Sequence, residues 1–95
     1  MVQSRHFEMA LSREEFLRLL PKAVPTPFAE GPEGTFRPAD GAARWTLRLV
    51  PLAPLHLGGL DLPRHRVELG LEGLDEPAAE AFLARFHRGF QRGGG

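Results

Sequence analysis

Residues 44–71 read RWTLRLVPLAPLHLGGLDLPRHRVELGL, and their alternation of apolar and polar side chains indicates the strands of a sheet. Side chains two residues apart share one face of a strand, so the apolar residues at odd positions predict a buried face. We expect the first strand to span Arg44 to Leu52 and to be ended by Pro51 and Pro54. A last strand is predicted from His65 to Leu71, where the same alternation returns.

Between these strands, Gly58-Gly59 predicts a tight hairpin, and we expect a turn with positive φ at both central positions. In that register the facing pairs are Leu57 with Leu60, Leu55 with Leu62, and His56 with Asp61, the last pair on the opposite side. Leucine is frequent in this short segment, at Leu52, Leu55, Leu57, Leu60 and Leu62. Two interpretations stay open: the leucines fold back over the core, or they form an exposed patch that a partner covers. If the hairpin projects, self-association is the simplest explanation.

Two helices are predicted. Ser12 and Glu15 have the spacing of a capping box, and the apolar residues that follow recur at helical spacing. Pro21 disfavours helical geometry at the residue before it, so we expect this helix to end near Leu20. The second helix is predicted to begin at Asp75 as its N-cap. Its apolar face consists of Ala79, Phe82, Leu83, Phe86 and Phe90.

The remaining segments complete the sheet. An alternating stretch from Gln3 to Ala10 indicates a half-buried strand. The Pro- and Gly-rich residues 25–43 predict a hairpin in which Thr35 to Arg37 leads into a turn at Pro38–Gly41 and out through Ala43. Two aromatic residues are expected to anchor this hairpin to the core, Phe28 and Phe36. The predicted fold class is α+β: a small two-layer sandwich with an antiparallel sheet of about four to five strands and two helices on one face, in β-α-β-β-β-α order.

Composition bounds the class of protein. A chain of 95 residues suffices for one domain and is too short for two. We expect residues 1–92 to form that domain and Gly93–Gly95 to be a flexible tail. Twelve basic and twelve acidic residues cancel, so no global field attracts nucleic acid or an anionic membrane. The N-terminus lacks the apolar core of a signal peptide, and a cytoplasmic protein without membrane contact is expected.

Motifs of known chemistry are absent from the sequence. The chain has no cysteine, which excludes disulfides, thiolate catalysis and Cys-based zinc sites. It also lacks a Gly-rich phosphate loop, a metal-binding histidine pair and a nucleophile elbow. The sequence therefore predicts no catalytic residue, no metal and no cofactor. His56 and Asp61 could form a general-base pair, but a cross-strand polar pair that fixes the register is the favoured interpretation.

Arginine supplies eleven of the twelve basic residues and is expected in two clusters. On the sheet, the side away from the helices is predicted to hold Arg44, Arg48, Arg64 and Arg66, with Glu8, Glu68 and Glu72. On the last helix, Arg85, Arg88 and Arg92 share one side. Cross-strand ion pairs and compensation of the helix dipole account for both clusters. The alternative is a nucleic-acid surface, although the aromatic side chains that stack on bases are expected in the core.

Two classes of function follow. The first is a small non-catalytic binding or accessory module that acts through an unknown protein partner or through homodimerisation. The second is a nucleic-acid-binding domain that uses the arginine-bearing sheet face or the last helix. An enzymatic role is the least favoured. The residues predicted to form an interaction surface are Leu55, Leu57, Leu60, Leu62, Arg48, Arg64, Arg66, Arg85, Arg88 and Arg92.

Overall fold

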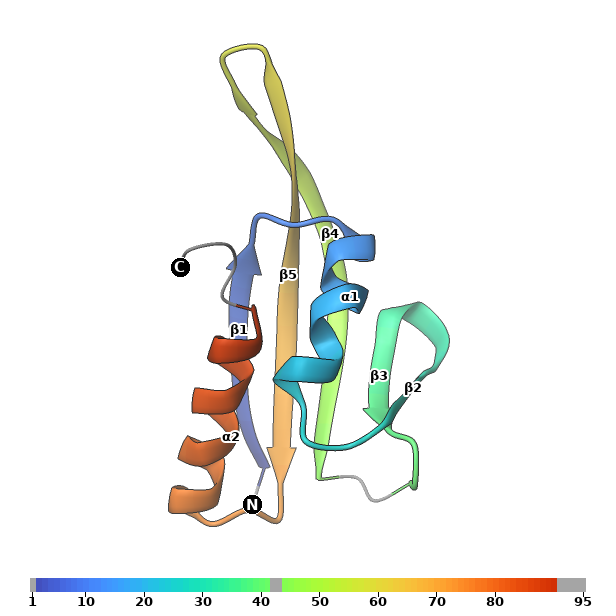
Figure 1. Cartoon of the computed structure of the whole chain (residues 1–95), viewed down its shortest axis with the longest axis vertical. Coiled ribbons are helices and arrows are strands. Elements are labelled where there is room, and N and C mark those ends of the chain that lie inside the picture. The colour runs from blue at the N-terminus through green and yellow to red at the C-terminus, as the bar shows by residue number, and fades with distance from the viewer. Residues whose placement is uncertain (1, 42–43, 91–95) are drawn as a thin grey trace.

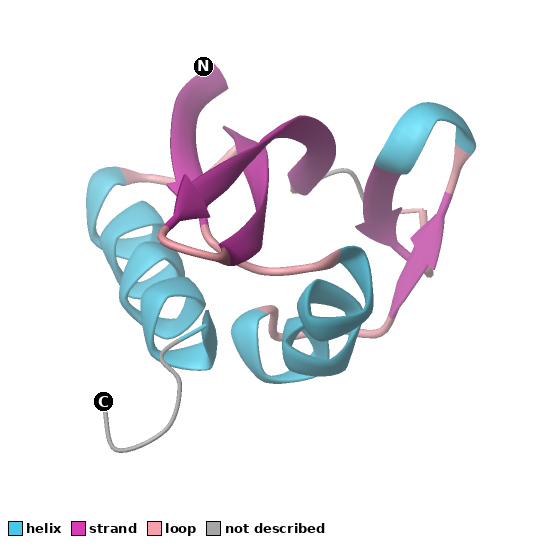
Figure 2. Cartoon of the chain, turned by 90° about the horizontal axis from the view of Figure 1, so that it is seen from above, coloured by secondary structure: helices cyan, strands magenta, loops and turns pink. Residues whose placement is uncertain are grey.

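Five antiparallel strands form one sheet, and two helices cover one of its faces (Figures 1 and 2). The structure is a computed structural model that describes residues 2–41 and 44–90. In chain order the elements are β1 (Val2–Met9), α1 (Arg13–Ala23), β2 (Phe28–Glu30), a 3-10 turn (Pro32–Gly34), β3 (Thr35–Pro38), β4 (Trp45–Leu57), β5 (Leu60–Glu72) and α2 (Glu76–Phe90). The predicted α+β sandwich is confirmed. None of the helices in the described residues is long and apolar enough to cross a membrane.

The long hairpin of β4 and β5 forms the centre of the sheet, because the strands lie in the order β1-β5-β4-β3-β2. The helices cover the part of the hairpin that is far from its tip. There the odd-numbered residues of both strands point into the core, as the alternation predicted. The buried facing pairs are Trp45 with Leu71, Leu47 with Leu69, and Leu49 with Val67.

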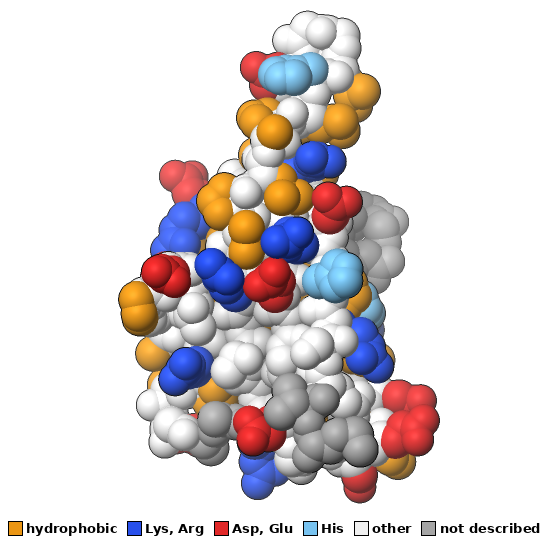
Figure 3. Space-filling model, turned by 180° about the vertical axis from the view of Figure 1, so that it is seen from behind, with side chains coloured by type: hydrophobic (Ala, Val, Ile, Leu, Met, Phe, Trp, Pro, Cys, Tyr) orange, Lys and Arg blue, Asp and Glu red, His pale blue; other side chains and the backbone are white. Residues whose placement is uncertain are grey.

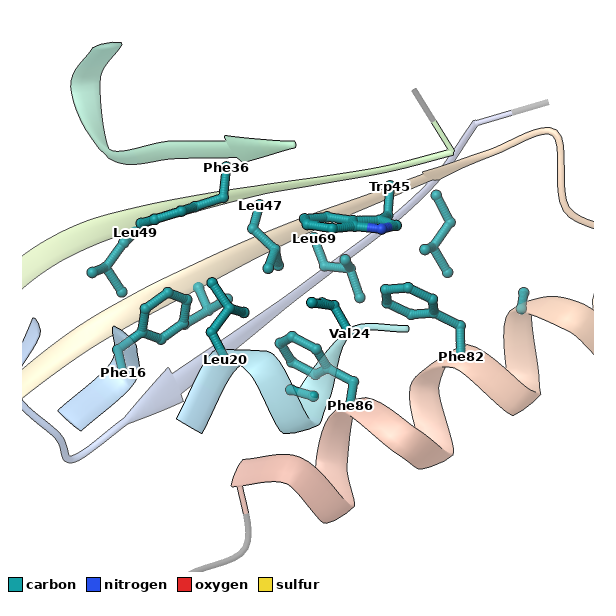
Figure 4. Packing of buried hydrophobic residues seen from close by; sticks show 14 of the residues in the cluster. Phe16, Leu20, Val24, Phe36, Trp45, Leu47, Leu49, Leu69, Phe82 and Phe86 are labelled. Atoms are coloured by element: carbon teal, nitrogen blue, oxygen red, sulfur yellow. The ribbon is translucent and has the colours of Figure 1, made fainter. Parts of the chain in front are cut away.

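Aromatic side chains join the two layers in the core (Figure 4). The ring of Phe16 in α1 lies 5.6 Å from that of Phe36 in β3 and 5.2 Å from that of Phe90 in α2, measured between centroids. Phe86 continues this cluster along α2, with its ring 4.9 Å from that of Phe90. Since aromatic contacts add to the free energy of apolar burial, the cluster holds both helices to the sheet.

Helix α1 begins at the predicted cap and runs past the predicted end. The Ser12 hydroxyl accepts a hydrogen bond of 3.1 Å from the backbone N–H of Glu15. The prediction that the helix ends near Leu20 is wrong, because it continues through Pro21 to Ala23. Leu20 and Ala23 are both buried. Their burial outweighs the local preference of the residue before a proline for extended geometry.

Helix α2 begins at its predicted N-cap, where the Asp75 carboxylate accepts a hydrogen bond of 2.9 Å from the N–H of Ala78. The predicted apolar face packs against the core, with Ala79, Phe82 and Phe86 buried and Leu83 and Phe90 partly buried. Near its C-terminal end, Gly89 lies directly against the backbone of Ala23, the last residue of α1. The N-terminal half of α2 extends past the end of α1 (Figure 1).

The predicted hairpin is present, because β3, which leads into the turn at Pro38–Gly41, pairs antiparallel with β4, and the same segment also forms a second hairpin that was not predicted. Strand β2 pairs with β3, and the 3-10 turn joins them. The turn predicted at Pro38–Gly41 is present, with the N–H of Gly41 donating to the carbonyl of Pro38 over 3.2 Å, but Pro38 is its first residue. The predicted exit through Ala43 lies outside the described residues. Phe36 is buried with Phe28 against its ring, so both anchors are confirmed.

Strand β4 does not end at Pro51 and Pro54 as predicted, but runs through both prolines. A register shift between Leu52 and Leu55 marks a bulge that accommodates Pro54. The neighbouring strands stop earlier: β1 pairs with β5 only as far as His65, and β3 pairs with β4 only at Leu47 and Arg48. Residues 52–64, which we call the arm, therefore project as a two-stranded hairpin beyond the rest of the fold (Figure 1).

The tip of the arm has the predicted register with a different turn geometry. Leu57 faces Leu60, Leu55 faces Leu62 and His56 faces Asp61. Of the two tip glycines only Gly58 has a positive φ, of 59°. The expectation that both glycines need a positive φ is therefore wrong, and Gly58 is the position where glycine is required.

Candidate interaction surfaces

One face of the arm is apolar and exposed to solvent. The side chains of Leu55, Leu57 and Leu60 are 38%, 52% and 65% exposed. Cross-strand partners point to the same side of a two-stranded hairpin, so Leu57 with Leu60 and Leu55 with Leu62 share one face of the arm. We call Leu52, Leu55, Leu57, Leu60 and Leu62 the leucine face. Figure 3, seen from the side of the sheet away from the helices, shows apolar side chains on the projecting hairpin and on the sheet next to it, with a histidine and a carboxylate at the tip. The interpretation that the leucines fold back over the core is wrong.

The other face of the arm carries the predicted pair of His56 and Asp61. The imidazole Nδ1 and the carboxylate are in hydrogen-bonding contact, and both side chains are 71% exposed. A solvated pair at a hairpin tip has no enclosed site in which a substrate could be held away from water. Among residues 2–41 and 44–90, no cluster of three or more potential metal ligands occurs. The pair joins β4 to β5 across the tip, and a cross-strand polar pair of this kind favours one register.

Three prolines lie within the two strands, in the arm or next to it. Pro51 and Pro54 lie in β4, and Pro63 lies in β5. A proline has no amide hydrogen to donate to an added strand, and prolines within sheets are typical of strand edges. We therefore expect these prolines to disfavour the pairing of a further strand with either edge of the hairpin. A partner is therefore expected to contact the faces of the arm.

The arginines on the outer side of the sheet are largely satisfied within the chain. Arg48 and Arg66 both form ion pairs with Glu68, at 3.8 Å and 3.3 Å. Arg64 donates a hydrogen bond of 3.2 Å from Nε to the carbonyl of Ala53 in the arm. Two guanidinium groups share one carboxylate, so positive charge remains on this side, but it is partly neutralised.

The same side of the sheet has a shallow depression where the side chains are small. A volume of about 440 Å³ lies over Ser4, Thr46 and Gly70, which are neighbours on β1, β4 and β5. Its rim includes Arg37 and Arg48. Arg37 was not predicted to lie here, because β3 is too short for alternation to show which way its side chains point. Among its described lining residues there is no Phe or Trp, and His6 is the one side chain with an aromatic ring.

Arg44 does not lie with the outer arginines as predicted. It lines a pocket on the helix side of the sheet, next to Trp45 and Phe82. The N–H of Glu72 donates to the carbonyl of Arg44 over 2.9 Å, so the backbone pairing reaches this residue, but Arg44 stands at the end of the strand, where its contacts are with the β3–β4 connection and α2. The prediction for Arg44 is therefore wrong.

The pocket that Arg44 lines is larger than the depression and has an apolar floor. Its volume is about 640 Å³, and it lies beside the N-terminal half of α2. Arg85 and Arg88 of the predicted helix stripe also line it, whereas Arg92 lies outside the described residues. The pocket was not predicted, because its walls come from the segment after α1, the β3–β4 connection and α2. The sequence contains no signal that brings these three segments together.

Comparisons with protein-family models, with curated proteins and with solved structures find no significant match to this chain.

Proposed function

We propose that this chain is a small non-catalytic interaction module that homodimerises through its leucine face. The observation that carries the proposal is the exposure of Leu55, Leu57 and Leu60 on a hairpin that projects from the fold. Large exposed apolar side chains gathered in one place are typical of surfaces that a partner covers. We place the module in the cytoplasm, in line with its lack of cysteine.

A second copy of the chain is the partner that these features favour. In a two-fold dimer the same patch is used on both copies, so an apolar face is its own complement. The twelve basic and twelve acidic residues give no net repulsion between copies at neutral pH. The prolines disfavour edge-to-edge strand pairing, which leaves face-to-face packing of two arms.

The exposed area predicts a weak dimer. The exposed fractions of the three leucines together equal about one and a half complete leucine side chains in each copy. Burying them in two copies is worth about 5–9 kcal/mol. Association costs roughly 4–15 kcal/mol in lost translational and rotational freedom. Because these amounts are similar, we expect the dimer to form only as the protein concentration rises.

Sedimentation velocity over a range of protein concentrations tests this proposal. The wild-type chain is expected to shift from monomer toward dimer as its concentration increases, and the L57S/L60S variant is expected to stay monomeric. The control is Glu14→Ser, an exposed position on α1 outside the arm, which should dimerise like the wild type. A wild-type chain that stays monomeric, or an L57S/L60S variant that dimerises equally well, contradicts the proposal.

The depression on the outer side of the sheet supports a second candidate, the binding of single-stranded nucleic acid. Small side chains leave room there for a phosphate backbone, with Arg37 and Arg48 at the rim. The ion pairs of Glu68 weigh against it, and so does a lining in which His6 is the one ring that could stack on a base among the described residues. Anisotropy of a labelled oligonucleotide discriminates the two functions: binding that falls steeply with salt, and is lost in the R37A/R48A variant, would favour this candidate.

A further inference from the structure

The pocket beside α2 exists because α1 is the shorter helix. Gly89 and Ala23 bring the C-terminal ends of the two helices into contact, and the chain then turns away from α2. The N-terminal half of α2 is left without a helix beside it. On that side the pocket is walled by Pro25 and Thr26 after α1 and by Ala78 and Ala81 of α2.

Two aromatic rings from opposite layers form the floor of the pocket. Trp45 rises from β4 and Phe82 from α2, with ring centroids 6.4 Å apart, and Figure 4 shows them pointing toward each other. The indole N–H of Trp45 donates to the hydroxyl of Thr26 over 3.3 Å, which fixes the ring. Both aromatic side chains are more than nine-tenths buried, so the floor is in place before a ligand arrives.

Three arginine residues line the pocket together with this apolar floor. Arg44, Arg85 and Arg88 line the pocket, and Asp40 is the one carboxylate among its described lining residues. The guanidinium groups of these three arginines have no ion-pair or hydrogen-bond partner in the described part of the chain. A planar guanidinium is suited to bidentate contact with a carboxylate, sulfonate or phosphate.

We propose that this pocket binds a small amphipathic organic anion, with an apolar ring system against Trp45 and Phe82 and its anionic group among the arginines. The volume of about 640 Å³ lies within the usual range for small-molecule sites. An apolar lining with a few convergent charged groups is the composition that such sites share. The pocket lies on the helix side of the sheet, so this inference does not depend on dimerisation through the leucine face.

Two fluorescent probes with the same ring system test the proposal. 8-Anilinonaphthalene-1-sulfonate carries a sulfonate, whereas N-phenyl-1-naphthylamine is neutral. The anionic probe is expected to bind the wild-type chain saturably and to quench the emission of Trp45, the single tryptophan of the chain. In the R85Q/R88Q variant its affinity should fall by about tenfold or more, as expected for the loss of charge-assisted hydrogen bonds.

Controls separate the pocket from the leucine face and from misfolding. The neutral probe should bind wild type and R85Q/R88Q with similar affinity, which shows that the apolar floor is intact. The L57S/L60S variant should bind the anionic probe like the wild type. Arg44→Gln, outside any helix or strand, should weaken the anionic probe on its own. The proposal is overturned if the wild type shows no saturable binding, if R85Q/R88Q and R44Q keep full affinity, or if L57S/L60S loses it.

Discussion

Gly89 is the residue on which the packing of the two helices depends most directly. A Cβ atom added at this position would lie 2.6 Å from the backbone nitrogen of Ala23, closer than real Cβ atoms approach. The atoms in the way belong to the backbone and Cβ of α1, which cannot rotate aside. A side chain at position 89 would therefore push the helices apart.

We predict that Gly89→Ala lowers the free energy of unfolding by about 1–2 kcal/mol, because overpacking outweighs the better helix propensity of alanine. Urea unfolding followed by circular dichroism measures the change. Gly59→Ala is the matched control, since nothing lies within 4 Å of an added Cβ there and its φ is not positive. Equal stability of both variants and the wild type would show that the helices do not meet at residue 89.

At the scale of elements, the arm is a two-stranded hairpin whose edges no other strand covers. We predict that the P51T/P63T variant aggregates more readily than the wild type. Both substitutions restore an amide donor at a place where β4 or β5 has no neighbouring strand on its outer edge. Light scattering during incubation of the protein measures this. Pro77→Thr replaces an exposed proline in the first turn of α2 and serves as the control. Unchanged scattering in P51T/P63T would mean that the prolines have no protective role.

Local signals predicted the elements that depend on local chemistry. The Ser12 and Asp75 caps, and the alternation that follows Trp45, correctly placed the starts of both helices and the buried face of β4. The predictions at Pro21 and Pro51 were wrong. The burial of Leu20 and Ala23 stabilises α1 beyond Pro21, and Pro51 lies where β4 has no neighbouring strand on one side, so a missing amide donor costs no hydrogen bond there. The depression and the pocket were missed, because their walls meet only in the folded chain.

At the scale of the whole molecule, the two candidate sites lie apart. The leucine face is on the arm, which projects beyond the helices, and the arginine-lined pocket lies beside the N-terminal half of α2 and contains no residue of the arm. The core that holds the helices to the sheet contains no residue of the leucine face. Substitutions in that face should therefore change self-association without unfolding the domain, which makes the arm testable by itself.

The most direct test of the central claim is an isotope-filtered NOE measurement on a mixture of methyl-labelled and unlabelled copies of the chain. We predict intermolecular NOEs between the leucine methyl groups of Leu57 and Leu60 in one copy and the leucine face of the other, at concentrations where sedimentation detects a dimer. Intermolecular NOEs that connect a different surface, or none at all from the leucine face at those concentrations, would contradict the account.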